Sequence, residues 1–155
     1  MKIAACELAG RTGHAAGREL LAALYREETG EALPPIALGA RGKPYFPGED
    51  WYFSISHTRR HAFCALSRRE IGIDAEELGR RVDLRLAEKI LSPGERAQFD
   101  AAPDKRRALL TFWVLKEAQA KKTGAGLAGY PADTAFSLDD PRVMEMDGCL
   151  VAVIE

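Results

Sequence analysis

The sequence lacks the features of a membrane protein, a secreted protein or a nucleic-acid-binding protein. No stretch approaches the roughly 20 apolar residues of a membrane span, and residues 1–7 contain no apolar run long enough for a signal peptide. The formal net charge is −1, so the whole molecule has no positive field that would favour nucleic acid. We therefore expect a cytoplasmic protein with neither a membrane nor a nucleic-acid partner.

Cysteine is scarce as well. Cys6, Cys64 and Cys149 are odd in number, lie far apart, and belong to apolar, strand-like runs rather than to a Cys-x-x-Cys pair. This pattern predicts buried thiols in a reducing compartment. The length of 155 residues suits one compact unit, or two small halves that share a core, and 46% hydrophobic residues can fill it. We expect one compact unit rather than a multidomain enzyme. We also expect the protein to be a monomer.

Strand and helix patterns alternate twice along the chain. The first series has strands at 2–8, 51–56 and 62–66, a helix at 14–28 and a Gly- and Pro-rich loop at 39–47. The second has a strand at 71–76, helices at 84–91, 92–102 and 105–123, and strands at 134–138, 142–146 and 149–154. The predicted fold class is α+β, with two similar halves related by a pseudo-twofold axis, each a small antiparallel sheet packed with a long helix. We place the halves at residues 1–68 and 69–155, with a ligand cleft at their junction.

The strands at 51–56, 62–66 and 71–76 are separated by short turns, which predicts a three-stranded meander. His57 lies at the end of the first of these strands. A histidine in that place is commonly structural or solvated, but this one follows Ser56 and comes one hairpin before the acidic strand at 71–76.

That strand, Ile-Gly-Ile-Asp-Ala-Glu, has two different faces. Its apolar face, made by Ile71, Ile73 and Ala75, suits a core. The other face carries Asp74 and Glu76, whose Cα atoms are roughly 7 Å apart in an extended strand. Gly72 lies on the same face and would leave room for a ligand. Two carboxylates in this arrangement suit one hard cation, although a half-buried strand with an acidic face toward water has the same pattern.

The helix predicted at 105–123 places Trp113, Glu117 and Lys121 along one stripe, at spacings of four and eight residues. This spacing alone also fits a surface ion pair. Together with Asp74 and Glu76, however, Glu117 gives three carboxylates from two elements. Oxygen ligands of this kind suit Mg²⁺ (magnesium), which usually shares its coordination shell with substrate phosphates. Polar residues of the first half would then face a phosphorylated ligand: Arg18, Lys43, Ser56 and His57.

Four short motifs occur in order along the chain: Gly-Lys-Pro at 42–44, Ser-Ile-Ser-His-Thr at 54–58, Ile-Gly-Ile-Asp-Ala-Glu at 71–76, and Trp-Val-Leu-Lys-Glu-Ala-Gln-Ala-Lys at 113–121. With these motifs the chain resembles the 4′-phosphopantetheinyl transferases, and among them the surfactin-synthetase-activating type. The resemblance covers roughly residues 42–127. It implies two similar α+β halves that hold coenzyme A between them.

The resemblance also implies an activity. The family transfers the 4′-phosphopantetheine arm of coenzyme A to a serine hydroxyl of an apo acyl or peptidyl carrier protein and releases adenosine 3′,5′-bisphosphate. The reaction depends on Mg²⁺, with Mn²⁺ as an alternative. Two other functions stay open: a non-catalytic homologue that binds coenzyme A or a carrier protein, and a Mg²⁺-dependent phosphohydrolase.

By the same resemblance, Asp74, Glu76 and Glu117 match the metal-binding acids, and Asp74, Glu117 and Lys121 match the catalytic residues. Glu117 is the candidate general base for the carrier serine, and Lys121 matches the lysine that stabilises or protonates the leaving phosphate. The residues that match positions contacting coenzyme A are Arg18, Lys43, Pro44, Ser56, His57 and Lys121.

The sequence departs from the family in two places. Ser54 stands where the family commonly has Asn. The first half is also shorter than in larger members, so only Arg11, His14 and Arg18 are available as additional basic residues to bind coenzyme A.

For the carrier protein we predict a docking segment at residues 79–91, where arginines would steer an acidic helix and leucines would hold it. An ordinary amphipathic helix with a solvated face has the same pattern.

Overall fold

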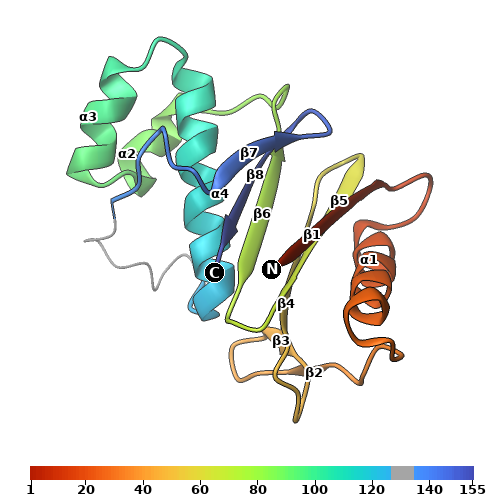
Figure 1. Cartoon of the computed structure of the whole chain (residues 1–155). Coiled ribbons are helices and arrows are strands. Elements are labelled where there is room, and N and C mark those ends of the chain that lie inside the picture. The colour runs from red at the N-terminus through yellow and green to blue at the C-terminus, as the bar shows by residue number, and fades with distance from the viewer. Residues whose placement is uncertain (127–134) are drawn as a thin grey trace.

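A computed structural model of the chain describes residues 1–126 and 135–155. Each half of the described chain forms a small antiparallel sheet beside one long helix (Figure 1). The first half contains β1 (Lys2–Glu7), α1 (Gly13–Thr29), β2 (Ala37–Leu38), β3 (Pro44–Tyr45), β4 (Tyr52–His57) and β5 (His61–Ser67). The second half contains β6 (Gly72–Glu77), the 3₁₀ turn η1 (Leu84–Leu86), α2 (Ala87–Ile90), α3 (Pro93–Ala101), α4 (Lys105–Thr123), β7 (Val143–Met146) and β8 (Cys149–Ile154).

The two three-stranded sheets have the same strand connectivity. Their orders are β1-β5-β4 and β6-β8-β7, so in each half the first strand pairs with the last one. All of these pairings are antiparallel. The predicted α+β class is therefore confirmed, whereas the pseudo-twofold axis and the division at residue 68 stay predictions.

The predicted three-stranded meander is wrong. Strands β4 and β5 form the expected hairpin, with Tyr52 opposite Ser67, but the other edge of β5 pairs with β1. Strand β6 belongs to the second sheet, where Gly72 lies opposite Ile154. A period of two in the sequence indicates a strand and its faces, but it does not indicate which neighbour the strand pairs with. Here the chain crosses from one sheet to the other after β5.

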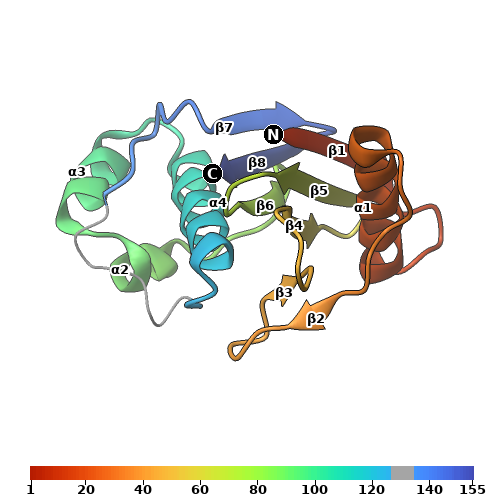
Figure 2. The ribbon, with the colours of Figure 1, turned by 60° about the horizontal axis from the view of Figure 1, so that its bottom comes forward.

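The two sheets enclose a shared apolar core. Its buried members come from β5, from β6 with the residue before it, and from β8, and Ile71, Ile73 and Ala75 are the predicted apolar face. The full set is Phe63, Ala65, Ile71, Ile73, Ala75, Cys149, Val151 and Val153. On the outer faces, α1 covers the first sheet and α4 covers the second (Figure 2).

Cys64 and Cys149 are buried free thiols as predicted, and burial raises the pKa of Cys64 to about 12. Cys6 is only half-buried.

Helix α4 begins and ends where the sequence predicts. The Asp104 side chain caps its first turn by accepting a hydrogen bond from Arg107 N, and Gly124 ends it in the left-handed conformation at φ +66°. The helix predicted at 84–91 is shorter, since η1 leads into the single-turn α2. The strand predicted at 134–138 is wrong for residues 135–138, which form no strand, while residue 134 lies outside the described residues. No helix within the described residues is long and apolar enough to cross a bilayer.

Gly72 has a different role from the one predicted. A Cβ atom at this position would lie 1.9 Å from the Ala118 carbonyl oxygen and 2.5 Å from Lys122 N, both in the backbone of α4. The space beside Gly72 is therefore filled by the helix and not by a ligand. Because the glycine lets α4 lie directly on β6, it brings Glu117 and Lys121 close to the acidic face of β6.

A buried ion pair lies one residue from Glu117. Lys116 Nζ is 2.8 Å from Glu95 Oε2, and the two side chains are 5% and 0% exposed. Glu95 also accepts hydrogen bonds from the backbone N–H groups of Ser92 and Phe136, at 2.8 and 3.1 Å. Ser92 and Glu95 thus form a capping box at the start of α3, and the glutamate additionally ties α3 to α4.

Candidate functional site

Two adjoining cavities lie where the halves meet. The larger has a volume of about 780 Å³ and the smaller about 300 Å³. They have four lining residues in common: Ile55, His57, Glu117 and Lys121. One ligand could therefore extend through both cavities.

Carboxylates from two elements line the smaller cavity. Asp74 and Glu76 come from β6, and Glu117 comes from α4, with Trp113 one turn away. Partial burial raises the pKa of Glu117 above its ordinary value of 4.5, and the negative charges of Asp74 and Glu76 raise it further, while Lys121 acts in the opposite direction. The small cavity therefore concentrates negative charge around a half-buried carboxylate.

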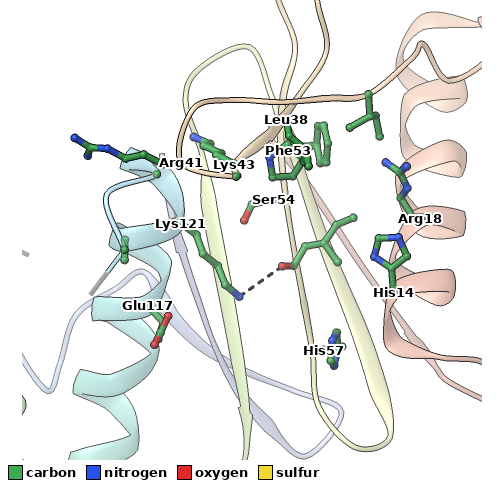
Figure 3. Close-up of a pocket in the computed structure, with 17 residues that line it drawn as sticks. His14, Arg18, Leu38, Arg41, Lys43, Phe53, Ser54, His57, Glu117 and Lys121 are labelled. Carbon is green, nitrogen blue, oxygen red and sulfur yellow. Dashed lines mark hydrogen bonds between the residues drawn. The ribbon is translucent and has the colours of Figure 1, made fainter. Parts of the chain in front are cut away.

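Asp74 is held by two donors on a single oxygen. Lys121 Nζ lies 2.7 Å from Asp74 Oδ1, and the Ser56 hydroxyl donates to the same oxygen at 2.9 Å. Lys121 also approaches the Ile55 carbonyl oxygen at 3.5 Å, so its ammonium group lies between β4 and β6 (Figure 3). Glu76 is paired with Arg80.

Cationic and imidazole side chains line the larger cavity from three sides (Figure 3). His14 and Arg18 come from α1, Arg41 and Lys43 from the loop joining β2 to β3, and His57 from the end of β4. An apolar part of the wall is formed by Ile36, Leu38 and Phe53. The cavity thus combines positive charge with an apolar surface.

Two glycines set the position of α1 against β4. A Cβ at Gly13 would lie 2.3 Å from His57 Cγ, and one at Gly17 would lie 2.4 Å from Ile55 Cγ2. The helix can approach β4 this closely only because both positions lack a side chain. This approach brings His14 and Arg18 to the same cavity as His57.

Lys43 connects the two halves. Its ammonium group donates a hydrogen bond to the Lys122 carbonyl oxygen at the end of α4, and a Cβ at Gly124 would lie 3.3 Å from Lys43 Cβ. Desolvation lowers the pKa of Lys43, with Glu70 raising it and Lys122 lowering it further. In this structure the lysine thus both lines the cavity and caps a helix of the other half.

The structure brings every predicted site residue to one of the two cavities: Arg18, Lys43, Pro44, Ser56, His57, Asp74, Glu76, Glu117 and Lys121. Their roles stay predictions. Sequence reasoning missed Arg41, whose signal was its place in the glycine-rich loop just before Lys43.

The three acids fit a hard cation in their chemistry. They line one cavity, and the pKa of Glu117 is raised in part by the charges of the other two, which a bound cation would neutralise. As arranged here, Asp74 is paired with Lys121 and Glu76 with Arg80. Within residues 1–126 and 135–155, no three His, Cys, Asp or Glu side chains already form a ligand set.

Comparisons with known proteins point to one family. A sequence model of the 4′-phosphopantetheinyl transferase superfamily matches residues 70–148. A 4′-phosphopantetheinyl transferase of Bacillus subtilis is 36% identical over 108 residues, which cover 66% of this chain and 47% of that protein. The 4′-phosphopantetheinyl transferase HetI of Nostoc is 37% identical over 97 residues, covering 57% and 41% of the two chains. Enterobactin synthase component D of Escherichia coli K12 is 36% identical over 128 residues, covering 77% and 60%. The chain thus spans about half the length of the curated relatives it matches.

Proposed function

Because this chain belongs to the 4′-phosphopantetheinyl transferase superfamily, we propose that it transfers the 4′-phosphopantetheine arm of coenzyme A to a serine of an apo acyl or peptidyl carrier protein. The observation that carries this proposal is the pair of adjoining cavities, one lined by three carboxylates and the other by cations. Phosphoryl transfer needs both kinds of lining. Cations compensate the negative charge of the phosphates, and a carboxylate can accept the proton that the attacking hydroxyl loses.

Coenzyme A would lie in the larger cavity. Its phosphates would be bound by Arg18, Arg41, Lys43 and His57, and its adenine would contact the apolar part of the wall. The close packing of α1 on β4 supports this placement, because it fixes Arg18 and His57 on one cavity. Pro44 restricts the backbone of Lys43 to extended conformations, which would limit how this lysine approaches the ligand.

Asp74, Glu76 and Glu117 would hold Mg²⁺, with Mn²⁺ as an alternative. When bound, the ion would neutralise charge on the pyrophosphate of coenzyme A and polarise the reacting phosphoryl group.

Glu117 would act as the general base. The serine oxygen attacks the phosphorus that carries the pantetheine arm, and its proton passes to Glu117. A new serine–phosphate bond forms as the bridging oxygen of the pyrophosphate leaves with adenosine 3′,5′-bisphosphate. The position of Glu117 supports this role, because it lines both cavities. Lys121 would stabilise or protonate the leaving phosphate after parting from Asp74.

The carrier protein would bind at residues 79–91. Arg81 and Arg85 are exposed there, and Leu84 is 43% exposed. Positive charge would steer an acidic helix to this surface, and Leu84 would contact it. Reversing both charges, with Arg81→Glu and Arg85→Glu, should raise the KM for carrier protein and leave the KM for coenzyme A unchanged.

We further propose that the protein acts as a cytoplasmic monomer.

One assay separates the proposed transferase from its alternatives. The chain is incubated with coenzyme A, Mg²⁺ and an apo carrier protein, and the carrier is examined by intact mass spectrometry. Addition of the arm supports the transferase. Cleavage of coenzyme A without labelling of the carrier would support a phosphohydrolase, and neither reaction would support a binding protein without catalysis.

A further inference from the structure

Two serines join the halves at the line where β4 meets β6. Ser54 and Ser56 are alternate residues of β4, and they are 6% and 5% exposed. Ser54 Oγ accepts a hydrogen bond from Ile73 N at 3.1 Å, and Ser56 Oγ accepts one from Ala75 N at 3.3 Å. The backbone ladders of the described strands do not join β4 to β6. The two hydroxyls thus satisfy buried amides of β6 that have no ladder partner on this side.

The serines differ in one contact. Ser56 also donates its proton to Asp74 Oδ1 at 2.9 Å, the oxygen that Lys121 contacts at 2.7 Å. The hydrogen bonds that described residues make to the Asp74 carboxylate both end on Oδ1. One carboxylate oxygen is therefore held by the protein, while the other is left for a ligand in the small cavity that Asp74 lines.

We propose that Ser56 is a positioning residue that fixes the orientation of the Asp74 carboxylate for metal binding; this inference rests on the proposed function. A hydroxyl has a single proton. Because Ser56 accepts the Ala75 amide hydrogen through a lone pair, its own proton is directed to Asp74. The amide thus orients the hydroxyl, and the hydroxyl orients the carboxylate.

The second donor explains why such a residue is needed. Lys121 is 32% exposed and would move from Asp74 to the leaving phosphate during the reaction. Ser56 is buried and would keep its contact with Asp74 when the lysine moves. Its hydroxyl would therefore hold Oδ1 throughout the cycle.

Ser54→Ala is the matched control for Ser56→Ala. Each substitution removes one buried hydroxyl and leaves one amide of β6 without its acceptor, so we expect similar decreases in the thermal unfolding midpoint. Only Ser56→Ala removes a donor from the carboxylate. Loss of a group that orients a metal ligand commonly weakens metal binding by about 10- to 100-fold.

The test measures Mn²⁺ binding to the protein without coenzyme A, by electron paramagnetic resonance, for the wild type and for Ser54→Ala, Ser56→Ala and Ser56→Thr. We expect Ser56→Ala to raise the Kd for Mn²⁺ by about tenfold or more, Ser54→Ala to raise it by less than about twofold, and Ser56→Thr to restore most of the affinity.

Equal effects of the two alanine variants on Mn²⁺ binding would reduce Ser56 to a structural link between the halves. An unchanged Mn²⁺ affinity in Ser56→Ala, or a wild type that binds no Mn²⁺, would overturn the inference. Because binding is measured without carrier protein, a chain that binds Mn²⁺ but transfers no arm would contradict the proposed function and leave the role of Ser56 intact.

Discussion

Lys121 Nζ on α4 lies 2.7 Å from Asp74 Oδ1 on β6, and this ion pair links the long helix of the second half to its acidic strand. The two side chains are 32% and 9% exposed, so the lysine is accessible while the aspartate is nearly enclosed. In the proposed mechanism, Lys121 leaves this pair and contacts the departing phosphate. Both residues should therefore matter for catalysis more than for folding.

Substitution of Lys121 by methionine should lower kcat by about 10²- to 10⁴-fold, the range typical for loss of a general acid or base. Its neighbour Lys122 offers a matched control, because the proposed site uses only the backbone carbonyl of Lys122, as an acceptor for Lys43. Steady-state kinetics of Lys121→Met and Lys122→Met should show the large loss in the first variant alone. Comparable losses in both variants would mean that charge at this end of α4, rather than Lys121 itself, supports the reaction.

Glu117 should destabilise the fold when it is ionised. Its pKa in the folded protein is raised above 4.5, chiefly by burial and then by Asp74 and Glu76, with Lys121 opposing. A raised folded-state pKa means that the stability contributed by this group is fully present below about pH 4.5 and is lost as pH rises through the folded value. Glu117→Gln should therefore be more stable than the wild type near neutral pH, and the difference should vanish below about pH 4.5.

Thermal unfolding across this pH range tests the expectation, with the exposed Glu88 on α2 replaced by glutamine as the control. The same Glu117→Gln protein should lose transfer while it still binds coenzyme A. Stability below that of the wild type at neutral pH would show that the negative charge of Glu117 is compensated in the folded protein.

Gly72→Ala should be strongly destabilising. The added methyl group would lie 1.9 Å from a backbone oxygen of α4, so helix and strand would have to separate. Overpacking of this kind typically costs about 1–3 kcal/mol, and this contact is with rigid backbone, which places it at the upper end. Gly79→Ala is the control, since a Cβ there meets nothing within 4 Å. Denaturant unfolding that gave equal stabilities for the two variants would show that α4 lies farther from β6.

Lys116→Met should cost about 3–5 kcal/mol, because it leaves the buried charge of Glu95 without its partner. The exposed pair between Arg96 and Asp100 on α3 gives the comparison, and its loss in Arg96→Met should cost at most about 0.5 kcal/mol. Chemical denaturation measures both. A cost below about 1 kcal/mol for Lys116→Met would indicate that water compensates the missing lysine.

The sequence predicted the elements well where local signals mark them. Asp104 and Gly124 mark the two ends of α4, and the alternation at 71–76 identifies both faces of β6. The candidate site could also be predicted, since all of its predicted residues lie at two adjoining cavities.

Long-range pairing was beyond these local signals. The prediction of a three-stranded meander was wrong because β6 pairs with β8, which lies about half the chain away in sequence. Gly72 was assigned to a ligand because a missing side chain indicates a close neighbour without saying which one. The ion pair between Glu95 and Lys116 joins two helices, and the bond from Ser56 to Asp74 joins the two halves, so no spacing within one element could indicate either contact.

We propose that this chain, about half the length of its curated relatives, is itself a transferase. The most direct measurement is the intact mass of an apo carrier protein after incubation with the chain, coenzyme A and Mg²⁺, beside a carrier whose acceptor serine is replaced by alanine. We predict that the serine carrier gains the mass of one phosphopantetheine arm, that the alanine carrier gains nothing, and that Glu117→Gln labels neither. A serine carrier left unmodified by the folded wild-type chain would contradict it.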